Sequence, residues 1–416
     1  MKHTDVVIVG GGMVGLAAAL ALAEAGITSV VLEHGSAPLP NPCEAAMQQN
    51  EHGYDARVSA LTCASQTLLE ALGVWDIMAS LRISPYTEMA VWDGVGSGNI
   101  HFSSQDLHEA ALGHIVENRV TVAALLTRAA QSEQVELIHE ASVAGMSEPD
   151  ENGLRVVSCT DGGTFAAPLV IAADGANSNI RRLASIPMWE WDYGHHAIVT
   201  TVTTEQPHQK TAWQRFTETG PLAFLPLDDP HHCSIVWSTT PDHARELSEL
   251  DDDTFCQHLT RAFEGRLGRV IATDARGSFP LRQRHAKYYV KPGLAVIGDA
   301  AHTIHPLAGQ GVNLGLMDAA ALAEQVSLAK QRGENYASEQ VLKRFQRQRQ
   351  CANLQMAASM EGFKRLFDSE MPAVKLLRSS GMNLLNRLGP VKQHIMYQAM
   401  GLGDDLPVIA RRPVRH

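Results

Sequence analysis

The chain has 416 residues, 45% of them hydrophobic and 19% charged, with a formal net charge of −11. This length predicts about two or three domains, and the composition excludes disorder over most of the chain. The apolar runs are too short to cross a membrane, and the N-terminus begins as a strand and not as a signal peptide. The six cysteines show no metal-ligand or disulfide pattern, so we expect a reduced, cytoplasmic protein without a metal site.

Charge is divided unevenly between a long acidic part and a basic C-terminal part. Residues 341–416 contain 13 Lys and Arg against 5 Asp and Glu, or +8, which leaves −19 for residues 1–340. An acidic body argues against nucleic-acid binding. The basic segment is helical in pattern, with Leu, Met and Phe among its charges, and two interpretations remain. It is either a helical cap with a solvated basic face, or a region that docks on anionic lipid or an acidic partner.

The first 33 residues predict a βαβ unit that binds a dinucleotide. The expected elements are a strand at residues 5–9, a helix at 16–25 and a second strand at 29–32. Gly10, Gly12 and Gly15 lie between the first strand and the helix, where they provide a tight turn, close passage of a pyrophosphate and close helix packing. Glu33 ends the second strand and can accept hydrogen bonds from ribose hydroxyls. An acid here favours an adenosine ribose without phosphate, as in FAD or NAD.

Two more polar sites lie next to predicted elements of residues 1–185, one at the end of a strand and one before a helix. Residues 168–173 form an apolar strand that ends in Asp174-Gly175, which is either a cofactor site or a turn-forming pair. Arg57 precedes a helix that should lie near the first glycine loop. It is either a phosphate contact or part of a surface ion pair.

The middle of the chain changes character. Residues 186–285 carry alternating apolar segments with aromatic and Pro punctuation and one amphipathic stretch, which predicts an antiparallel sheet with a helix. A strand followed by Gly returns at residues 294–298. We therefore predict an α/β protein with a discontinuous Rossmann-like domain at 1–185 and 286–340, an inserted substrate domain at 186–285, and a helical region at 341–416.

Residues 296–315 form the stretch on which the other motifs converge. An apolar strand runs into Gly298-Asp299, the chain turns at Pro306, and a Gly-rich loop opens an Ala-rich helix. Asp299 can accept hydrogen bonds from sugar hydroxyls, and the helix start presents free N–H groups to negative charge. This composition is typical of a loop that holds a cofactor, and the alternative is an ordinary strand-to-helix connection.

Three motifs now stand in order: Gly10 to Gly15 with Glu33, Asp174-Gly175, and Gly298-Asp299 followed by Pro306 and the Gly-rich loop. This order resembles the class A FAD-dependent aromatic monooxygenases, the group of para-hydroxybenzoate hydroxylase. Within that group, residues 114–118 and 298–315 are similar to the ubiquinone-biosynthesis hydroxylases. The wording of three further stretches, at 191–196, 224–231 and 398–402, is most similar to the polyprenylphenol hydroxylases of the UbiI or VisC type.

The resemblance implies a set of residues that hold FAD and approach the reacting ring. Those expected to bind cofactor are Gly10, Gly12, Gly15, Glu33, Arg57, Arg119, Asp174, Gly175, Asp299, Gly309, Gly311, Val312 and Asn313. The Asp174-Gly175 motif is associated in this family with both FAD and NADPH. Pro306 would pack close to flavin carbon 4a, and a helix start near Gly311 would stabilise the anionic reduced flavin.

The resemblance also implies the reaction. NADPH or NADH reduces FAD, O2 adds at flavin carbon 4a to give a hydroperoxide, and oxygen is transferred to the ring of a polyprenylphenol in ubiquinone biosynthesis. His305, His195 and His196 are the possible bases. A long prenyl tail implies a peripheral membrane or complex contact, for which the basic C-terminal region is the predicted surface. The alternatives are a soluble phenol or salicylate-type hydroxylase, and a non-catalytic flavoprotein assembly subunit.

Overall fold

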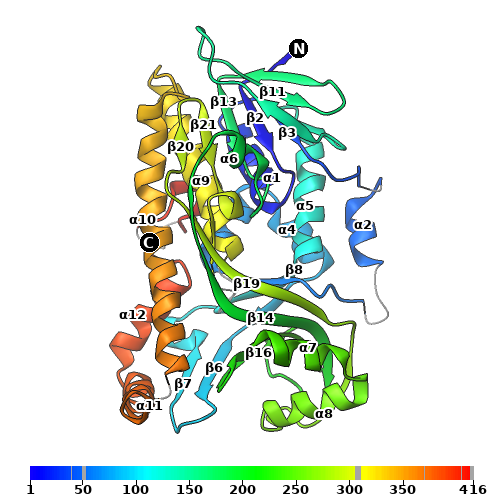
Figure 1. The fold of residues 1–416 in the computed structure, drawn as a ribbon, viewed down its shortest axis with the longest axis vertical. Helices are drawn as coiled ribbons and strands as arrows, with labels where there is room; N and C mark the ends of the chain where they lie inside the picture. Colours follow the sequence, from blue (N-terminus) through cyan, green and yellow to red (C-terminus); the bar gives the residue numbers. More distant parts are fainter. Residues whose placement is uncertain (39, 49–52, 305–310, 370, 404, 413–416) are drawn as a thin grey trace.

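The molecule has an upper region of sheet and helices and a lower sheet region, joined by two long strands (Figure 1). A computed structural model describes residues 1–38, 40–48, 53–304, 311–369, 371–403 and 405–412. The joining strands are β14 (Met188–Thr204) and β19 (Gly277–Ala286), which pair antiparallel along most of their length. Both strands run from the lower sheet to the upper region, so the two regions are connected by continuous β-strands as well as by side-chain contacts.

A six-stranded, mainly parallel sheet forms the centre of the upper region. In spatial order it contains β20 (Val290–Lys291), β21 (Leu294–Val296), β13 (Leu169–Ala172), β2 (Val6–Val9), β3 (Ser29–Leu32) and β9 (Val135–Ile138). Strands β2 and β13 are buried along their whole length, as expected for parallel strands covered on both faces. The strand order reverses at the β2–β13 pair, and ligands bind at such switch points, beyond the carboxyl ends of the strands.

Helix α1 (Met13–Ala23) packs between α5 (Asn118–Ala130) and α9 (Gly311–Gln331) beside this sheet. A small sheet contains β1 (Lys2–His3), β12 (Thr164–Ala167), β11 (Arg155–Cys159) and β10 (Val143–Met146). Another contains β4 (Val58–Leu61), β8 (Gly113–Glu117) and β5 (Ser84–Tyr86). The helices beside them are α2 (Pro42–Met47), α3 (Cys63–Ala71), α4 (Trp75–Leu81) and α6 (Asn179–Leu183).

The lower region is one large, mainly antiparallel sheet. Besides β14 and β19 it contains β17 (His232–Thr239), β16 (Gly220–Pro226), β15 (Thr211–Thr217), β6 (Glu88–Asp93) and β7 (Asn99–Ser103), with β18 (Val270–Thr273) and β22 (His302–Thr303) at its margins. Helices α7 (Pro241–Glu249) and α8 (Asp252–Ala262) accompany it (Figure 1). Leu222 and Phe224 of β16 belong to the same apolar core as Phe255 and Leu259 of α8.

The predicted boundary of the inserted domain misses part of this sheet. Strands β6 and β7 pair antiparallel as a hairpin. However, β6 also pairs parallel with β15, so a hairpin from the segment assigned to the nucleotide-binding domain extends the lower sheet. Period-two alternation predicts strands but not their partners, since pairing with β15 is decided by contacts more than 100 residues apart in the chain.

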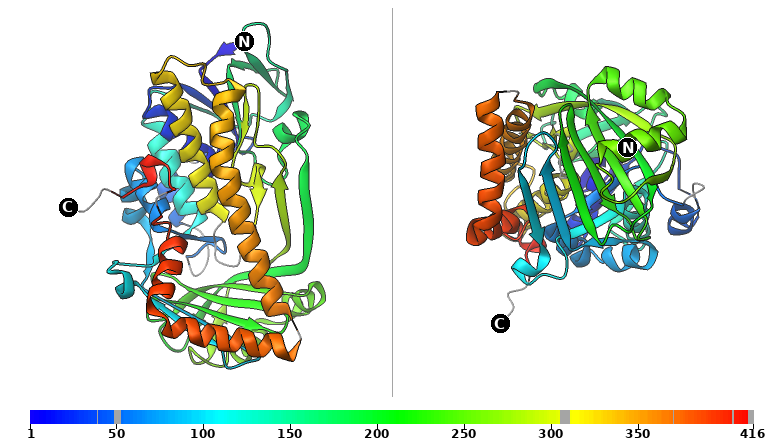
Figure 2. Two further views of the ribbon diagram at one scale, coloured as in Figure 1. Left: turned by 90° about the vertical axis from the view of Figure 1, so that its left-hand side faces the viewer. Right: turned by 90° about the horizontal axis from the view of Figure 1, so that it is seen from below.

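Three helices make up most of the C-terminal part of the chain: α10 (Glu339–Asp368), α11 (Pro372–Arg387) and α12 (Gly389–Ala399). Figure 2 shows α10 running along the molecule from the upper region to the lower one, with α11 and α12 at the outside of the lower sheet. Leu342 and Phe345 of α10 are fully buried in the core of the upper region. The predicted boundary at residue 341 therefore falls within a helix that begins in that core. None of the described helices combines the length and hydropathy needed to cross a bilayer.

Candidate active site

The glycines after β2 differ in what surrounds them. A Cβ on Gly15 would lie 1.9 Å from the Gly10 carbonyl oxygen, and one on Gly10, whose φ is +108°, would lie 2.3 Å from the Ala173 carbonyl oxygen. A Cβ on Gly12 would meet nothing within 4 Å. Gly10 and Gly15 are thus required by packing of the protein itself, whereas Gly12 borders open space at the uncapped start of α1. A pyrophosphate fits this space, because the first helical N–H groups point toward it.

Glu33 stands at the end of β3, beside the same glycine loop. Its carboxylate accepts hydrogen bonds from the Gly11 N–H at 2.6 Å and the Gly35 N–H at 2.8 Å. These two bonds fix the carboxylate. His34 Nδ1 also lies 2.9 Å from Oε1, the oxygen that Gly35 contacts, so Oε2 is the oxygen that keeps a further lone pair for a sugar hydroxyl. The side chain is 19% exposed, so it remains reachable from the crevice. The arrangement fits the predicted contact with the adenosine ribose.

Asp299 lies in the short helix η2 (Gly298–Ala300) beyond the end of β21. Its side chain is accessible to solvent. Many protein atoms nevertheless surround the carboxyl, and this burial raises its pKa, while the charges of His302 and Arg57 oppose the rise. Arg57, just before β4, is exposed and acts on Asp299 through its charge. The structure therefore brings these two predicted residues to one side of the crevice.

Arg119 is held by protein groups. It donates to the Glu117 carboxylate at 2.9 Å and to the Gly53 carbonyl at 2.6 Å. Arg82 also pairs with Glu117, at 2.7 Å, and Glu117 is 3% exposed. The sequence carried no signal for Arg82 or for the shared carboxylate, because the three residues come from separate elements. A direct contact between Arg119 and FAD stays a prediction.

Asp174 caps a helix. It accepts hydrogen bonds from the Asn179 N–H at 2.7 Å and the Ser178 hydroxyl at 2.5 Å, at the start of α6. Gly175 has a φ of +78° and open space around it, as a turn requires. Asp174 and Gly175 therefore form a turn, and their contact with FAD or NADPH stays a prediction. Arg181, which the sequence did not single out, donates to the Ala176 and Ala300 carbonyls and so ties this loop to η2.

The start of α9 is anchored by Asn313. Its amide oxygen accepts from the Thr62 N–H at 3.1 Å and from the Ser65 hydroxyl at 2.7 Å, and its amide nitrogen donates to the Ala60 carbonyl. A Cβ on Gly311 would meet nothing within 4 Å. The side chain of Asn313 therefore serves the fold, and contact of the Gly311 and Val312 backbone with FAD stays a prediction. The predicted residues His305, Pro306 and Gly309 lie outside the described residues.

Beneath η2 lies a buried ion-pair network that sequence reasoning missed. Asp318 of α9 is fully buried and accepts from His302 at 2.5 Å, Arg349 at 2.9 Å and the Gly298 N–H at 3.1 Å. Burial raises the pKa of Asp318, but His302 and Arg349 outweigh it and bring the pKa down to about 2. Asn353 extends the network to Tyr289. These bonds connect α9, α10 and η2, the elements on both sides of residues 305–310.

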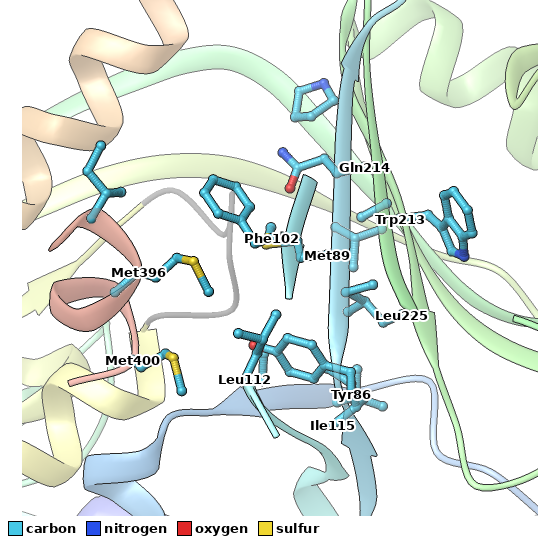
Figure 3. A pocket seen from close by; sticks show the side chains of 18 of the residues that line it. Tyr86, Met89, Phe102, Leu112, Ile115, Trp213, Gln214, Leu225, Met396 and Met400 are labelled. Atoms are coloured by element: carbon cyan, nitrogen blue, oxygen red, sulfur yellow. The ribbon is translucent and has the colours of Figure 1, made fainter. Parts of the chain in front are cut away.

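A largely apolar cavity of about 230 Å³ lies between the lower sheet, the β4–β8–β5 sheet and α12 (Figure 3). Alternation along β16 explains one wall: Leu222 and Phe224 point to the core, and Ala223 and Leu225 line the cavity. Its polar lining groups include Tyr86, Gln214 and Ser238. Strand β4 links the cavity to the crevice, because Ala60 lines the cavity and its carbonyl holds Asn313. His195 and His196, predicted as possible bases, are not among the lining residues.

Comparison with known proteins agrees with this geometry. Residues 3–359 match a family model described as an FAD binding domain. The chain is 39% identical over 401 residues to a 3-demethoxyubiquinol 3-hydroxylase of Escherichia coli (strain K12), covering 96% of this chain and 99% of that one. The chain belongs to the ubiquinone-biosynthesis family of FAD-dependent monooxygenases. A ubiquinone biosynthesis monooxygenase of Xenopus tropicalis is 36% identical, over 94% of this chain and 92% of that one.

Solved structures confirm the predicted fold class of this monooxygenase. The p-nitrophenol 4-monooxygenase PnpA of Pseudomonas putida DLL-E4 superposes with a TM-score of 0.76 at 20% identity, over 96% of this chain and 99% of that one. FAD is therefore the cofactor of this aromatic-ring hydroxylase, with NADPH or NADH the reductant typical of the family. The finer placement in the UbiI or VisC type stays a prediction. Within the described residues no three His, Cys, Asp or Glu side chains are grouped to hold a metal.

Proposed function

We propose that this monooxygenase hydroxylates the aromatic ring of a prenyl-substituted phenol in ubiquinone biosynthesis. The observation that carries the proposal is the cavity beside the FAD crevice. An apolar cavity of about 150 Å³ holds one benzene ring, so 230 Å³ takes a substituted ring and a short part of a prenyl chain. The names of the relatives support the substrate class, since one is a demethoxyubiquinol hydroxylase and the other a ubiquinone biosynthesis monooxygenase.

Bound FAD, reduced by NADPH or NADH, would activate O2 for transfer of one oxygen atom to the ring. The chain would position the ring and exclude water. Tyr86 and Gln214 present a hydroxyl and an amide to the cavity (Figure 3). Burial raises the pKa of the Tyr86 hydroxyl, which keeps it neutral and able to donate a hydrogen bond to a ring oxygen. The apolar lining excludes water from the ring. The described residues offer no histidine base in the cavity lining, so ring activation rests on these polar groups and on the flavin side of the site.

The test is turnover by the purified holoprotein with O2 and either NADPH or NADH. We expect a flavin spectrum that bleaches faster when a short-chain prenylphenol or a demethoxyubiquinol analogue is present, with hydroxylated product formed in proportion to reductant consumed. Stimulation by salicylate or simple phenols with equal efficiency would favour the soluble phenol hydroxylase. Bound FAD without product from any phenol would favour a non-catalytic assembly subunit. Comparing the two prenylated substrates decides which ring is attacked.

A further inference from the structure

Helix α11 is amphipathic in the inverted sense: it buries its polar side. Arg378 and Ser379 are buried, and the Arg378 guanidinium donates to Asp93 of β6 at 2.8 Å. Asn383 and Asn386 accept hydrogen bonds from backbone N–H groups of β7 at 3.1 and 3.2 Å. These bonds fix which face of α11 meets the sheet. The opposite face is therefore held outward by polar contacts and not left there by loose packing.

The outward face of α11 is made of leucines. Leu376 and Leu377 are 70% and 71% exposed, and Leu384 and Leu388 are 57% and 43% exposed. The spacing from Leu377 to Leu384 and Leu388 is that of one stripe on a helix. Ser380, Gly381 and Arg387 are also exposed on this side. Single exposed leucines need no explanation, but several large apolar side chains grouped on one helix face mark a surface that contacts something apolar.

Helix α12 continues this face and forms a wall of the substrate cavity. Met396 and Met400, at its inner side, are buried and line the cavity, while Val391 is 49% exposed. Ile395 does both, since it lines the cavity and is 39% exposed. One helix thus separates the apolar outer surface from the apolar interior. We define the outer face as Leu376, Leu377, Leu384, Leu388, Val391 and Ile395.

The charge around the outer face selects its partner. Residues 371–400 contain four Lys and Arg and no Asp or Glu, in a chain whose net charge is −11. Arg378 and Lys392 are used inside the protein, on Asp93 and Asp106, whereas Lys375 and Arg387 form no ion pair with the described residues. Leucines flanked by cations suit the headgroup and acyl boundary of an anionic bilayer. The basic charge predicted for the whole of 341–416 is thus partly internal, because Arg349 and Arg378 are buried.

We propose that the outer face of α11 and α12 docks on an anionic lipid bilayer and that α12 borders the path between bilayer and cavity. The role of α12 beside this path rests on the proposed function, since it concerns a substrate with a prenyl chain. The cavity has room for the ring and little more, so a long chain leaves it along an apolar wall. Ile395 and Val391 of α12 provide such a wall that ends at the docking face.

The test uses the full-length holoprotein and its double variant Leu377→Asp with Leu384→Asp. Vesicles of phosphatidylglycerol and phosphatidylcholine should co-sediment with the parent protein, less so in high salt, and the variant should partition about tenfold less or lower. Ile271→Asp, at a side chain 57% exposed on β18, is the matched control and should bind vesicles like the parent. Flavin absorbance and turnover of a short-chain prenylphenol in solution should be unchanged in both variants.

Equal vesicle binding by the parent and the double variant, or no binding by either, overturns the docking proposal. A parent dimer that the double variant converts to monomer, without vesicle binding, overturns it in favour of a second copy on this face. If the parent protein turns over no prenylphenol, the proposed function is contradicted. That outcome is distinguishable from failed docking, because vesicle binding is measured without catalysis. With docking present, the variant should lose turnover of a long-chain substrate in vesicles and keep turnover of the short-chain one.

Discussion

The FAD crevice and the substrate cavity are built in different ways. The predicted FAD crevice consists of loops that each follow one strand of the parallel sheet, and the groups predicted to hold FAD there are mainly backbone N–H groups with Glu33 and Asp299. The cavity is lined by side chains of several strands and a helix, with residues as distant as Val58 and Met400. A crevice of local loops is recognisable from short motifs. A cavity of long-range contacts leaves no motif, because its lining is assembled only when the strands pair.

The largest effect is expected beneath the crevice. Asp318→Ala would leave Arg349 and His302 buried without their carboxylate, which costs about 3–5 kcal/mol of the free energy of unfolding. Urea unfolding followed by circular dichroism measures this loss. Glu339→Ala, which removes an exposed partner of Lys343, is the control and should change stability by less than about 1 kcal/mol. Similar losses for the two variants would show that the network adds little to the upper region.

The free energy of unfolding should fall in mildly acidic solution, because two histidines are buried in their neutral form. Burial lowers the pKa of His285 to about 4, helped by His302, and lowers that of His114 to about 4, helped by Arg412. Both folded pKa values lie below the unfolded value, so the stabilisation is complete above about pH 6.5 and is lost as the pH falls toward 4. Each histidine contributes a slope of about 1.4 kcal/mol per pH unit. Replacing His285 or His114 by Gln should reduce the slope, and an unchanged slope would contradict the assignment.

A pair of glycine variants separates packing from cofactor binding in the crevice. Gly15→Ala introduces a Cβ against the Gly10 carbonyl and should lower the free energy of unfolding of the apoprotein by about 1–3 kcal/mol. Gly12→Ala meets no protein atom within 4 Å, so the apoprotein should keep its stability and lose affinity for FAD. Thermal unfolding of apoprotein and flavin titration by fluorescence quenching give the two quantities. Equal destabilisation of the apoprotein by both substitutions would argue against open space at Gly12.

Filling the cavity should affect substrate and spare FAD. Ala223→Phe places a ring among the lining residues, and we expect kcat/KM for a prenylphenol to fall by about tenfold or more. The flavin content should stay that of the parent, since Ala223 does not border the crevice. Ala130→Phe, at an exposed alanine that ends α5, should leave both quantities unchanged. A drop in flavin content with Ala223→Phe would mean that the two sites are less separate than the geometry indicates.

The smallest effect is expected from one polar group in the cavity. Tyr86→Phe removes a hydroxyl and keeps the ring, so the lost hydrogen bond should raise the barrier by about 1 kcal/mol, a roughly fivefold fall in kcat/KM. Steady-state kinetics with a prenylphenol measures it. The same substitution should not alter turnover of an analogue that lacks the ring oxygen facing Tyr86, because such a ring offers no acceptor. Equal losses with both substrates would assign Tyr86 to packing instead.

Features that depend on residues close together in the chain could be predicted from the amino-acid sequence. Strands of β-branched residues, glycines at fixed spacing and the acid at Glu33 follow from the backbone conformation and charge that each loop requires. They predict an FAD site at the ends of strands. The helical character of the C-terminal part was also readable, because it depends on periodicity within each helix. The three-motif order then indicated the monooxygenase family, which the relatives confirmed.

Tertiary structure decided everything that depends on partners distant in the chain. The pairing of β6 with β15, the buried carboxylate of Asp318 shared by His302 and Arg349, and the closure of the cavity by α12 all join segments separated by more than about 15 residues. A sequence pattern reports which face of a helix is apolar, but not whether that face is buried. In α11 the answer is the reverse of the usual one, because Arg378 and two asparagines find partners on β6 and β7.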